Sequence, residues 1–163
     1  MRQVAQFYKV SKEQFFADFE GENAAAIYEA IKLPKRATVG SAGYDFFAPI
    51  DITLAPGETA KIATGIRVRI DDGWVLKLYP RSGLGFKFRL QMNNTVGIID
   101  SDYYNSDNEG HIFAKITNDS NEGKTVTIRQ GEGFMQGIFV EYGIIYDDEV
   151  TEKRNGGFGS TTK

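Results

Sequence analysis

The stretch IRVRIDDGWVLKLY, residues 66–79, decides the fold class of this chain. Its first half alternates apolar and charged residues with a period of two, which is typical of a half-buried strand. Its second half is rich in β-branched and aromatic residues, and the DDG between the halves is a turn signal. Two strands separated by a short turn are therefore expected here.

The same texture continues on the C-terminal side. Further short segments rich in β-branched and aromatic residues are HIFAKIT (111–117), KTVTIRQ (124–130) and GIFVEYGIIY (137–146), and turn signals such as NDSNEG and QGEG separate them. Strands do not alternate with long helices, and there is no internal repeat. An antiparallel sandwich or barrel is therefore expected.

The N-terminal side has a helical texture instead, from Ser11 to Ile31. Ser11 and Gln14 form a capping-box signature, and apolar residues including Phe15 follow at helical spacing. Asn23 is expected to cap a second short helix. The sequence thus predicts a single β-rich domain over residues 1–163 with a helical insertion at residues 11–31.

The composition excludes several kinds of site. A formal net charge of −3 over 163 residues argues against general binding to nucleic acid, which needs a basic face. The chain has no cysteine, and His111 is its only histidine, so a thiolate metal site or catalysis by several histidines is not expected. No apolar run approaches the ~20 residues of a membrane span, and no signal-peptide pattern appears. A cytoplasmic protein without membrane attachment is expected.

The segment YPRSGLGFK, residues 79–87, is a candidate phosphate-binding segment. Gly83 and Gly85 let backbone N–H groups approach a ligand closely, and Arg81 and Ser82 add donors suited to phosphate. The order of residues is not that of a P-loop. The alternative is a barrel turn that carries a solubilising arginine.

The segment NNTVGIIDSDYYN, residues 93–105, offers a candidate base. An apolar strand interrupted by Gly97 ends at Asp100, whose carboxylate needs only a water within hydrogen-bond reach to act as a general base. Tyr103 follows at a distance from which a hairpin could fold its ring back over the same site. The alternative is a plain β-hairpin in which Asp100 forms the turn.

Three more polar positions have both a structural and a functional interpretation. Asp45 in GSAGYDFFAP is either turn chemistry or an outer-shell partner of hydrated Mg²⁺. Gln136 lies in an otherwise apolar strand, where a buried amide is a structural hydrogen-bonder or a ligand contact. The terminal RNGGFGSTTK sets Phe158 among glycines with Arg154 upstream, so its ring packs on the chain or orders over a flat, negatively charged ligand.

Taken together and in order, five segments resemble the five motifs of the trimeric dUTP pyrophosphatases (dUTPases). The resemblance spans about Leu33 to Thr162, and the segments are AGYDFFAP, PRSGLGFK, NNTVGIIDSDYY, GEGFMQGIF and RNGGFGSTT. It implies a distorted jelly-roll β-barrel, in which the insertion at 11–31 has no counterpart in the minimal pattern. It also implies a mobile glycine-rich C-terminal arm at residues 152–163.

The resemblance implies hydrolysis of dUTP to dUMP and pyrophosphate, with Mg²⁺ held mainly by the triphosphate. This reaction keeps uracil out of DNA and supplies dUMP for dTMP synthesis. Asp100 matches the carboxylate that activates the water attacking the α-phosphorus, and Tyr103 matches the ring beneath the deoxyribose that leaves no room for a 2′-hydroxyl. The uracil-reading hairpin is matched by Asn94, Gly97, Ile98 and Ile99.

The remaining matches concern the phosphates and the metal. Arg81, Ser82 and Gly83 match the phosphate-binding loop, Gln136 matches a further phosphate contact, and Asp45 matches an acidic residue near the metal's water shell. In the terminal motif, Arg154 matches an arginine finger, Phe158 a ring that stacks on uracil, and Gly159, Ser160 and Thr161 donors to the terminal phosphates. The resemblance further implies a homotrimer whose arms cross between subunits, so that each site is built from three chains.

This chain departs from the family's pattern at three places. Gly133 stands where the fourth motif usually carries an arginine, so a salt link is missing or rebuilt. Lys153 holds the usual spacing to Phe158 and Arg154 stands one residue closer, which leaves open which of them is the cationic finger. The loop at residues 105–110 is longer than usual.

Two other functions stay open at this stage. A dCTP deaminase of the same superfamily would need acid and base groups facing the base's exocyclic amine. A phage-type dUTPase would also bind a regulatory protein, through residues 11–31 or 105–110. The simpler interpretation of these two segments is that they cover the barrel surface or a trimer edge.

Overall fold

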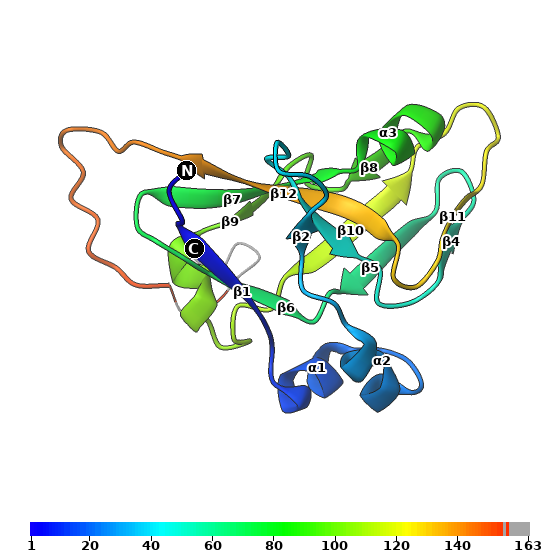
Figure 1. The fold of residues 1–163 in the computed structure, drawn as a ribbon, viewed down its shortest axis with the longest axis horizontal. Coiled ribbons are helices and arrows are strands. Elements are labelled where there is room, and N and C mark those ends of the chain that lie inside the picture. Colours follow the sequence, from blue (N-terminus) through cyan, green and yellow to red (C-terminus); the bar gives the residue numbers. More distant parts are fainter. Residues whose placement is uncertain (155, 157–163) are drawn as a thin grey trace.

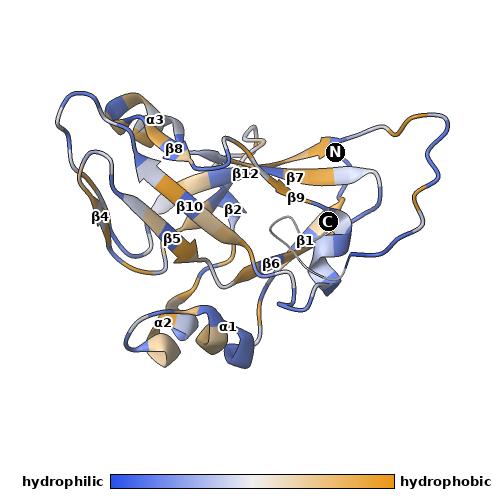
Figure 2. Cartoon of the chain, turned by 180° about the vertical axis from the view of Figure 1, so that it is seen from behind, coloured by the Kyte–Doolittle hydropathy of each residue, from blue (hydrophilic) through white to orange (hydrophobic). Residues whose placement is uncertain are grey.

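The computed structural model describes residues 1–154 and 156. Strands dominate it, and two short helices lie beneath them, away from the long C-terminal segment (Figure 1). Apolar residues are concentrated in the strands, whereas most connecting loops are polar (Figure 2). The expected jelly-roll-like, mostly β fold with small helical content is confirmed.

The largest sheet has five strands in the order β2-β3-β12-β7-β9, with antiparallel pairing throughout. The long strands β12 and β7 form its centre, and Gln136 pairs with both Asp45 and Tyr79. The strands are β2 (Lys35–Arg36), β3 (Tyr44–Phe47), β12 (Gly133–Glu141), β7 (Trp74–Pro80) and β9 (Gly97–Ile99).

The remaining described strands form three smaller sheets. Within the described part of the chain, the four sheets are separate and do not join into one closed barrel. A three-stranded sheet has the order β5-β10-β8, and two pairs are β1-β6 and β11-β4. Their bounds are β5 (Thr59–Ala63), β10 (Phe113–Asn118), β8 (Leu90–Met92), β1 (Ala5–Lys9), β6 (Ile66–Ile70), β11 (Val126–Ile128) and β4 (Ile52–Leu54).

The alternation in the opening stretch is confirmed by burial. Ile66, Val68 and Ile70 are buried in the core, whereas Arg69 is exposed and Arg67 is half-buried. The strand pairs antiparallel with β1 rather than with β7, so the turn at residues 71–73 carries the chain from one sheet to another. One continuous hydrophobic cluster collects the inward faces of these sheets.

Two expectations about local structure are wrong. The strand expected over residues 137–146 ends at Glu141, because Glu141 pairs with Trp74 and the partner strand β7 begins there. The candidate phosphate-binding segment is not a loop but the short helix α3 (Ser82–Phe88), with Arg81 at its N-cap.

The expected helices at residues 11–31 are present as α1 (Lys12–Asp18) and α2 (Ala24–Ala30). The Ser11 hydroxyl accepts a hydrogen bond from the Gln14 N–H at 3.1 Å, as the capping box predicts, but the Gln14 side chain donates to Asp18 instead. Asn23 occupies the N-cap of α2 in the left-handed region without a capping side-chain bond. Among the helices described, none has the length and apolar character needed to cross a bilayer.

Candidate active site

The turn between β8 and β9 leaves two strand edges open. Within the described sheets, β8 pairs with β10 and β9 pairs with β7, and β8 and β9 do not pair with each other. The segment is therefore not the plain hairpin that the sequence suggested. Strand edges present unpaired N–H and C=O groups in a fixed spacing. Such groups can recognise a flat polar ligand.

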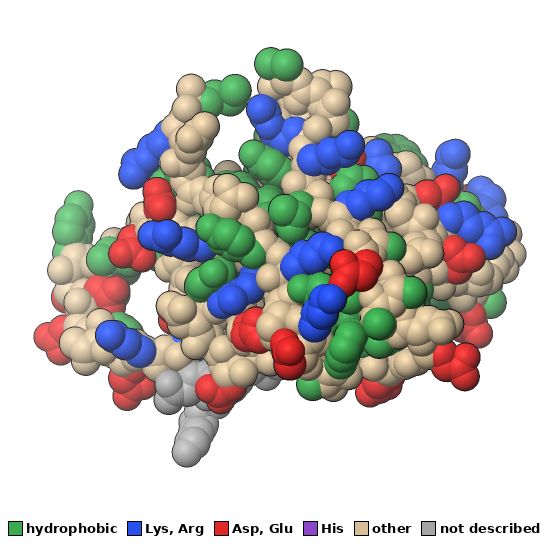
Figure 3. Space-filling view, turned by 60° about the horizontal axis from the view of Figure 1, so that its bottom comes forward, with side chains coloured by type: hydrophobic (Ala, Val, Ile, Leu, Met, Phe, Trp, Pro, Cys, Tyr) green, Lys and Arg blue, Asp and Glu red, His purple; other side chains and the backbone are tan. Residues whose placement is uncertain are grey.

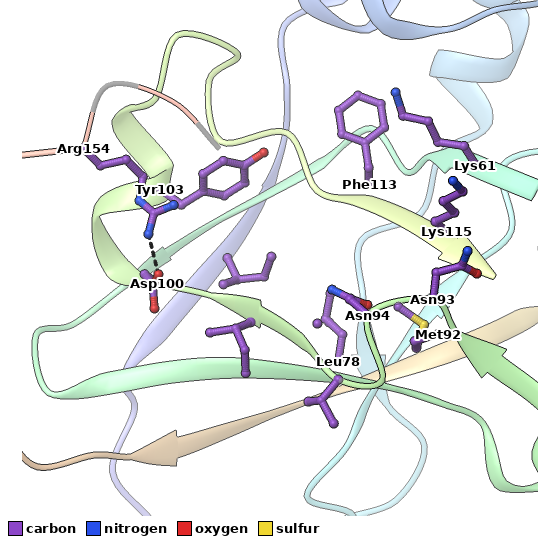
Figure 4. Close-up of a pocket in the computed structure, with 14 residues that line it drawn as sticks. Lys61, Leu78, Met92, Asn93, Asn94, Asp100, Tyr103, Phe113, Lys115 and Arg154 are labelled. Carbon is purple, nitrogen blue, oxygen red and sulfur yellow. Dashed lines mark hydrogen bonds and ion pairs between the residues drawn. The ribbon is translucent and has the colours of Figure 1, made fainter. Parts of the chain in front are cut away.

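A cavity of about 700 Å³ lies at this turn (Figure 4). Its walls come from the β8–β9 segment, from β10 and β5 on the opposite side, and from the chain beyond β12. The lining residues with polar groups or rings are Lys61, Asn93, Asn94, Asp100, Tyr103, Phe113, Lys115 and Arg154. The predicted residues Asn94, Gly97, Ile98, Ile99, Asp100, Tyr103 and Arg154 all line it, and we call these seven the cavity cluster.

Gly97 is required by packing rather than by an unusual backbone conformation. A Cβ added there would lie 3.0 Å from the Leu78 Cβ and 3.1 Å from its Cδ1. Leu78 pairs with Gly97 across the β7–β9 ladder and itself lines the cavity. The glycine therefore allows the two strands to approach closely directly beneath the cavity.

Asp100 follows β9 and opens the 3₁₀ helix η1 (Ser101–Asn105). Its side chain is 46% exposed and forms an ion pair with Arg154, whose Nη2 lies 2.5 Å from the Asp100 Oδ2. The Nε of Arg154 also donates to the Asp102 Oδ1 at 3.0 Å. Figure 4 shows this guanidinium next to the Tyr103 ring, whose centre lies 6.0 Å from the Arg154 Cζ. Lys153, the other candidate finger, is exposed.

Tyr103 is buried, with only 6% of its surface exposed. Its hydroxyl donates to the backbone carbonyl of His111 at 2.7 Å and accepts from the Asn108 amide at 2.9 Å. Burial raises the pKa of the Tyr103 phenol, so the group stays a protonated donor. The two hydrogen bonds of the hydroxyl therefore fix the orientation of the Tyr103 ring.

The other predicted residues gather in a second place. Arg81 lies with its Nε 3.3 Å from the Asp45 carboxylate, and the Gln136 amide lies 3.4 Å from the carbonyl oxygen of Pro80. We call Asp45, Arg81 and Gln136 the Arg81 cluster. Ser82 and Gly83 begin the adjacent helix α3. Of the residues that the structure describes, these five do not line the cavity.

Gly133 explains how the Arg81 cluster is held. A Cβ added at Gly133 would lie 2.9 Å from the Arg81 Nη1, which itself approaches the Gly133 carbonyl at 3.4 Å. The guanidinium thus occupies the space over the glycine and pairs with Asp45 across it. Arg81 and Asp45 thus form an ion pair at this position, while whether a salt link is missing or rebuilt at Gly133 stays as the sequence left it.

Some residues that line the cavity could not be predicted from the sequence. Lys61 and Lys115 are directly opposite each other on β5 and β10, and the Lys61 ammonium lies 4.7 Å from the centre of the Phe113 ring. No motif marks them, because each is an outward-facing position of an ordinary strand. Among the described residues, no group of three or more acidic, histidine or cysteine side chains could hold a metal. Phe158, Gly159, Ser160 and Thr161 lie outside the described residues.

Comparison with known proteins identifies the family. Residues 29–162 match the dUTPase family. The deoxyuridine 5′-triphosphate nucleotidohydrolase of Lactococcus lactis subsp. lactis is 46% identical over 134 residues, covering 80% of this chain and 88% of the relative. The crystal structure of dUTPase from Streptococcus mutans has a TM-score of 0.65 at 34% identity, covering 85% of this chain and 97% of that chain.

A mutant of the Staphylococcus bacteriophage 80alpha dUTPase with dUpNHpp shares the fold at a TM-score of 0.66 and 22% identity, covering 93% of this chain and 98% of that chain. The fold, the cavity and these relatives define a nucleotide hydrolase of the jelly-roll type. This chain belongs to the dUTPase family. Membership sets aside the deaminase alternative.

Proposed function

We propose that the chain hydrolyses dUTP to dUMP and pyrophosphate, with the nucleoside bound in the cavity cluster. One observation carries this proposal: a carboxylate, a buried tyrosine ring and an open strand edge line the same cavity of about 700 Å³. The Lactococcus lactis relative, which is named for hydrolysis of this nucleotide, supports the same activity.

The open edge of β9 suits uracil. One side of Gly97–Ile99 is committed to the ladder with β7, and the other side has fixed donors and acceptors near the Asn94 amide. Uracil has an N–H between two carbonyl oxygens, and cytosine replaces one of these oxygens with an amine. A mismatched base would leave a buried group unpaired, which costs ~1–3 kcal/mol.

Tyr103 suits discrimination at the sugar. Because its hydroxyl is already hydrogen-bonded to His111 and Asn108, the ring cannot turn away to admit a larger group without breaking those bonds. A deoxyribose fits against such a fixed face, whereas a 2′-hydroxyl would collide with it. UTP is therefore rejected because its 2′-hydroxyl collides with the Tyr103 ring, and not through an electrostatic difference.

Asp100 is the proposed general base. Its carboxylate takes a proton from a water, whose oxygen attacks the α-phosphorus while the bond to the bridging oxygen breaks and pyrophosphate leaves. Arg154 is the cation that we assign to the charge developing on the phosphates, in preference to Lys153. Its pairing with Asp100 and Asp102 supports this assignment, because it brings the guanidinium to the reacting side of the cavity. These pairs lie within one chain, whereas the resemblance implies an arm that crosses to the site of a neighbouring chain.

The Arg81 cluster is the proposed phosphate side of the site. Arg81, Gln136, Ser82 and Gly83 supply donors, and Phe158, Gly159, Ser160 and Thr161 keep the roles that the resemblance implies. Mg²⁺ held by the triphosphate would neutralise part of its charge. Asp45 fits the position of a hydrogen-bond acceptor for water on that ion, because its carboxylate is partly exposed beside Arg81.

The separation of these two groups supports a homotrimer, the assembly that the resemblance implies. The cavity cluster and the Arg81 cluster do not share one pocket among the described residues, yet one nucleotide must meet both. A closed symmetric oligomer brings the cavity of one chain to the Arg81 cluster of the next. Each site is then shared between chains.

A regulatory protein partner stays a prediction of the sequence. Both segments suggested for it, residues 11–31 and 105–110, are packed against the core, with Phe15 fully buried and Glu109 bonded to Ser11. These contacts favour a structural task for the segments.

The proposed function is tested by pyrophosphate release with dUTP, UTP, dTTP and dCTP compared side by side in the presence of Mg²⁺. We expect turnover of dUTP and at most a small rate with the other three. Equal cleavage of UTP, or intact dUTP after prolonged incubation, would overturn the proposal.

A further inference from the structure

Helix α1 is tied at both ends to the chain segment that carries Tyr103. At its N-cap, the Ser11 N–H and hydroxyl donate to the two carboxylate oxygens of Glu109, at 2.9 and 2.5 Å. At its last residue, the Asp18 carboxylate lies 2.6 Å from the His111 Nδ1. Glu109 and His111 both follow Tyr103 closely in sequence, so one short helix fixes both sides of this loop.

His111 is fully buried and its proton position is set by its partners. The Gly65 N–H donates to the His111 Nε2 at 2.8 Å, so this nitrogen is an acceptor. The proton of the neutral ring therefore sits on Nδ1, which donates to Asp18. Both ring nitrogens are used, and no histidine side chain is visible on the face drawn in Figure 3.

The packing around this pair leaves little freedom. Gly65 has φ +73°, and a Cβ added there would lie 2.3 Å from the Ile31 Cδ1 and 3.4 Å from the Phe15 ring. Phe15 is itself fully buried, with its ring centre 6.2 Å from that of His111. The insertion therefore closes over the imidazole rather than lying loosely on the surface.

His111 reaches the cavity by two contacts: its ring centre lies 4.5 Å from the ring centre of the cavity-lining Phe113, and its carbonyl oxygen binds the Tyr103 hydroxyl. The Tyr103 hydroxyl donates to the carbonyl oxygen of His111, so a shift of the backbone at residue 111 moves the acceptor that orients the ring. The loop between Tyr103 and His111 is tightly packed at Gly110, because a Cβ added there would lie 2.6 Å from the Tyr103 carbonyl oxygen. Displacements of about 1 Å are enough to matter in an active site.

We propose that Asp18 and His111 are positioning residues for Tyr103, so that the helical insertion at residues 11–31 sets the preference for dUTP over UTP. The inference rests on the proposed contact of Tyr103 with the sugar. Asp18 anchors the imidazole, the imidazole holds the backbone at residue 111, and that carbonyl holds the tyrosine ring. The insertion thus acts on selectivity without touching the substrate.

The test is the ratio of kcat/KM for dUTP to kcat/KM for UTP. Partial unfolding lowers both constants by the same factor, so the ratio reports the shape of the site and not the amount of folded enzyme. For Asp18→Ala we expect the ratio to fall roughly tenfold, in line with small misplacements of an active-site group. Asp18→Asn keeps a carbonyl acceptor for the His111 Nδ1–H and should retain most of the ratio.

Two substitutions of His111 each keep one of the two hydrogen bonds of its ring nitrogens. His111→Asn keeps a donor near the Nδ1 position, and His111→Gln keeps an acceptor near the Nε2 position. If Asp18 anchors the ring, His111→Asn should retain more of the selectivity than His111→Gln. Glu29→Gln is the matched control, since it removes the exposed Lys12–Glu29 ion pair of the same segment and should leave the ratio unchanged.

Tyr103→Ala separates failure of this inference from failure of the proposed function. If Tyr103→Ala leaves the ratio at the wild-type value, the sugar contact itself is wrong. If Tyr103→Ala lowers the ratio but Asp18→Ala and His111→Gln do not, the sugar contact stands and the positioning role of the insertion is overturned.

Discussion

The cavity cluster and the Arg81 cluster are built in opposite ways. The first comes from one continuous stretch, from the turn after β8 to Tyr103, joined only by Arg154. The second comes from three distant stretches that the β3–β12–β7 register brings together, with Gln136 paired to Asp45 and bonded to Pro80. The comparison suggests that the local stretch selects the nucleoside, whereas the assembled cluster holds any triphosphate.

The largest effect is expected from Asp100→Asn. This change keeps the shape of the cavity cluster but removes the base, so kcat should fall about 10³-fold, within the range of general-base catalysis. Binding of dUTP, followed by titration, should change little. Asp119→Asn is the control, because that exposed carboxylate pairs with Arg89 and lies outside both clusters. Normal turnover of Asp100→Asn would refute the assigned base.

Arg81→Ala tests the role of the Arg81 cluster in the comparison. Loss of charge-assisted hydrogen bonds to phosphate should lower kcat/KM roughly 30-fold. Since the phosphates of dUTP and UTP are identical, both substrates should lose by the same factor. Arg129→Ala, at an exposed arginine paired with Asp51, is the matched control. A large shift in the dUTP to UTP ratio would contradict the division of labour.

Gly97→Ala tests the packing beneath the cavity. The added methyl would press on Leu78 at 3.0 Å, so the free energy of unfolding should fall by about 1–3 kcal/mol. The KM for dUTP should rise as β9 moves. Gly40→Ala, where an added Cβ meets nothing within 4 Å, should leave both quantities unchanged. Urea unfolding measures the difference, and wild-type stability with wild-type KM in Gly97→Ala would contradict this account.

The smallest effect concerns pH. Burial lowers the pKa of His111 below its ordinary 6.5, against the opposing influence of Asp18 and Glu109, while Lys61 acts in the same direction as burial. As pH falls below 6.5, the unfolded chain takes up a proton that the folded chain does not, so the free energy of unfolding decreases.

His111→Gln cannot titrate at this position, and its unfolding free energy should decline less steeply than that of the wild type between pH 7 and pH 5. The comparison is clean because the chain has no other histidine. Equal slopes, or a wild type that gains stability on acidification, would contradict the burial of a neutral imidazole.

The strands could be predicted because their signals are local, whereas most residues of the cavity cluster were predicted only from the resemblance to the dUTPases. The alternation in β6 predicted its buried face, and the apolar run ending at Asp100 predicted a carboxylate at the end of a strand. The pairing of strands was not predictable in this way. That β8 and β9 belong to different sheets depends on β10 and β7, which lie elsewhere in the sequence.

The missed features share the same cause. His111 gave no functional signal as a lone histidine, because its partners Asp18 and Gly65 come from the insertion and from the turn between β5 and β6. Likewise, the sequence marked Gly133 as an absent arginine, but only the fold shows that the Arg81 guanidinium lies over this glycine. Periodicity predicts faces, whereas contacts between distant segments need the tertiary structure.

A mixed oligomer tests the central claim most directly. The Asp100→Asn variant lacks the proposed base, and the Arg81→Ala variant lacks the arginine of the phosphate-binding cluster. Each variant alone should therefore have little activity. After unfolding together and refolding, random association should leave about one quarter of the sites with an intact cavity from one chain and an intact Arg81 cluster from its neighbour. Recovery of activity toward that level is the predicted result. Refolding either single variant with the Asp100→Asn/Arg81→Ala double variant serves as the control, because no site in that mixture can combine an intact Asp100 with an intact Arg81. A mixture of Asp100→Asn and Arg81→Ala that stays as inactive as its parents would contradict a site shared between chains.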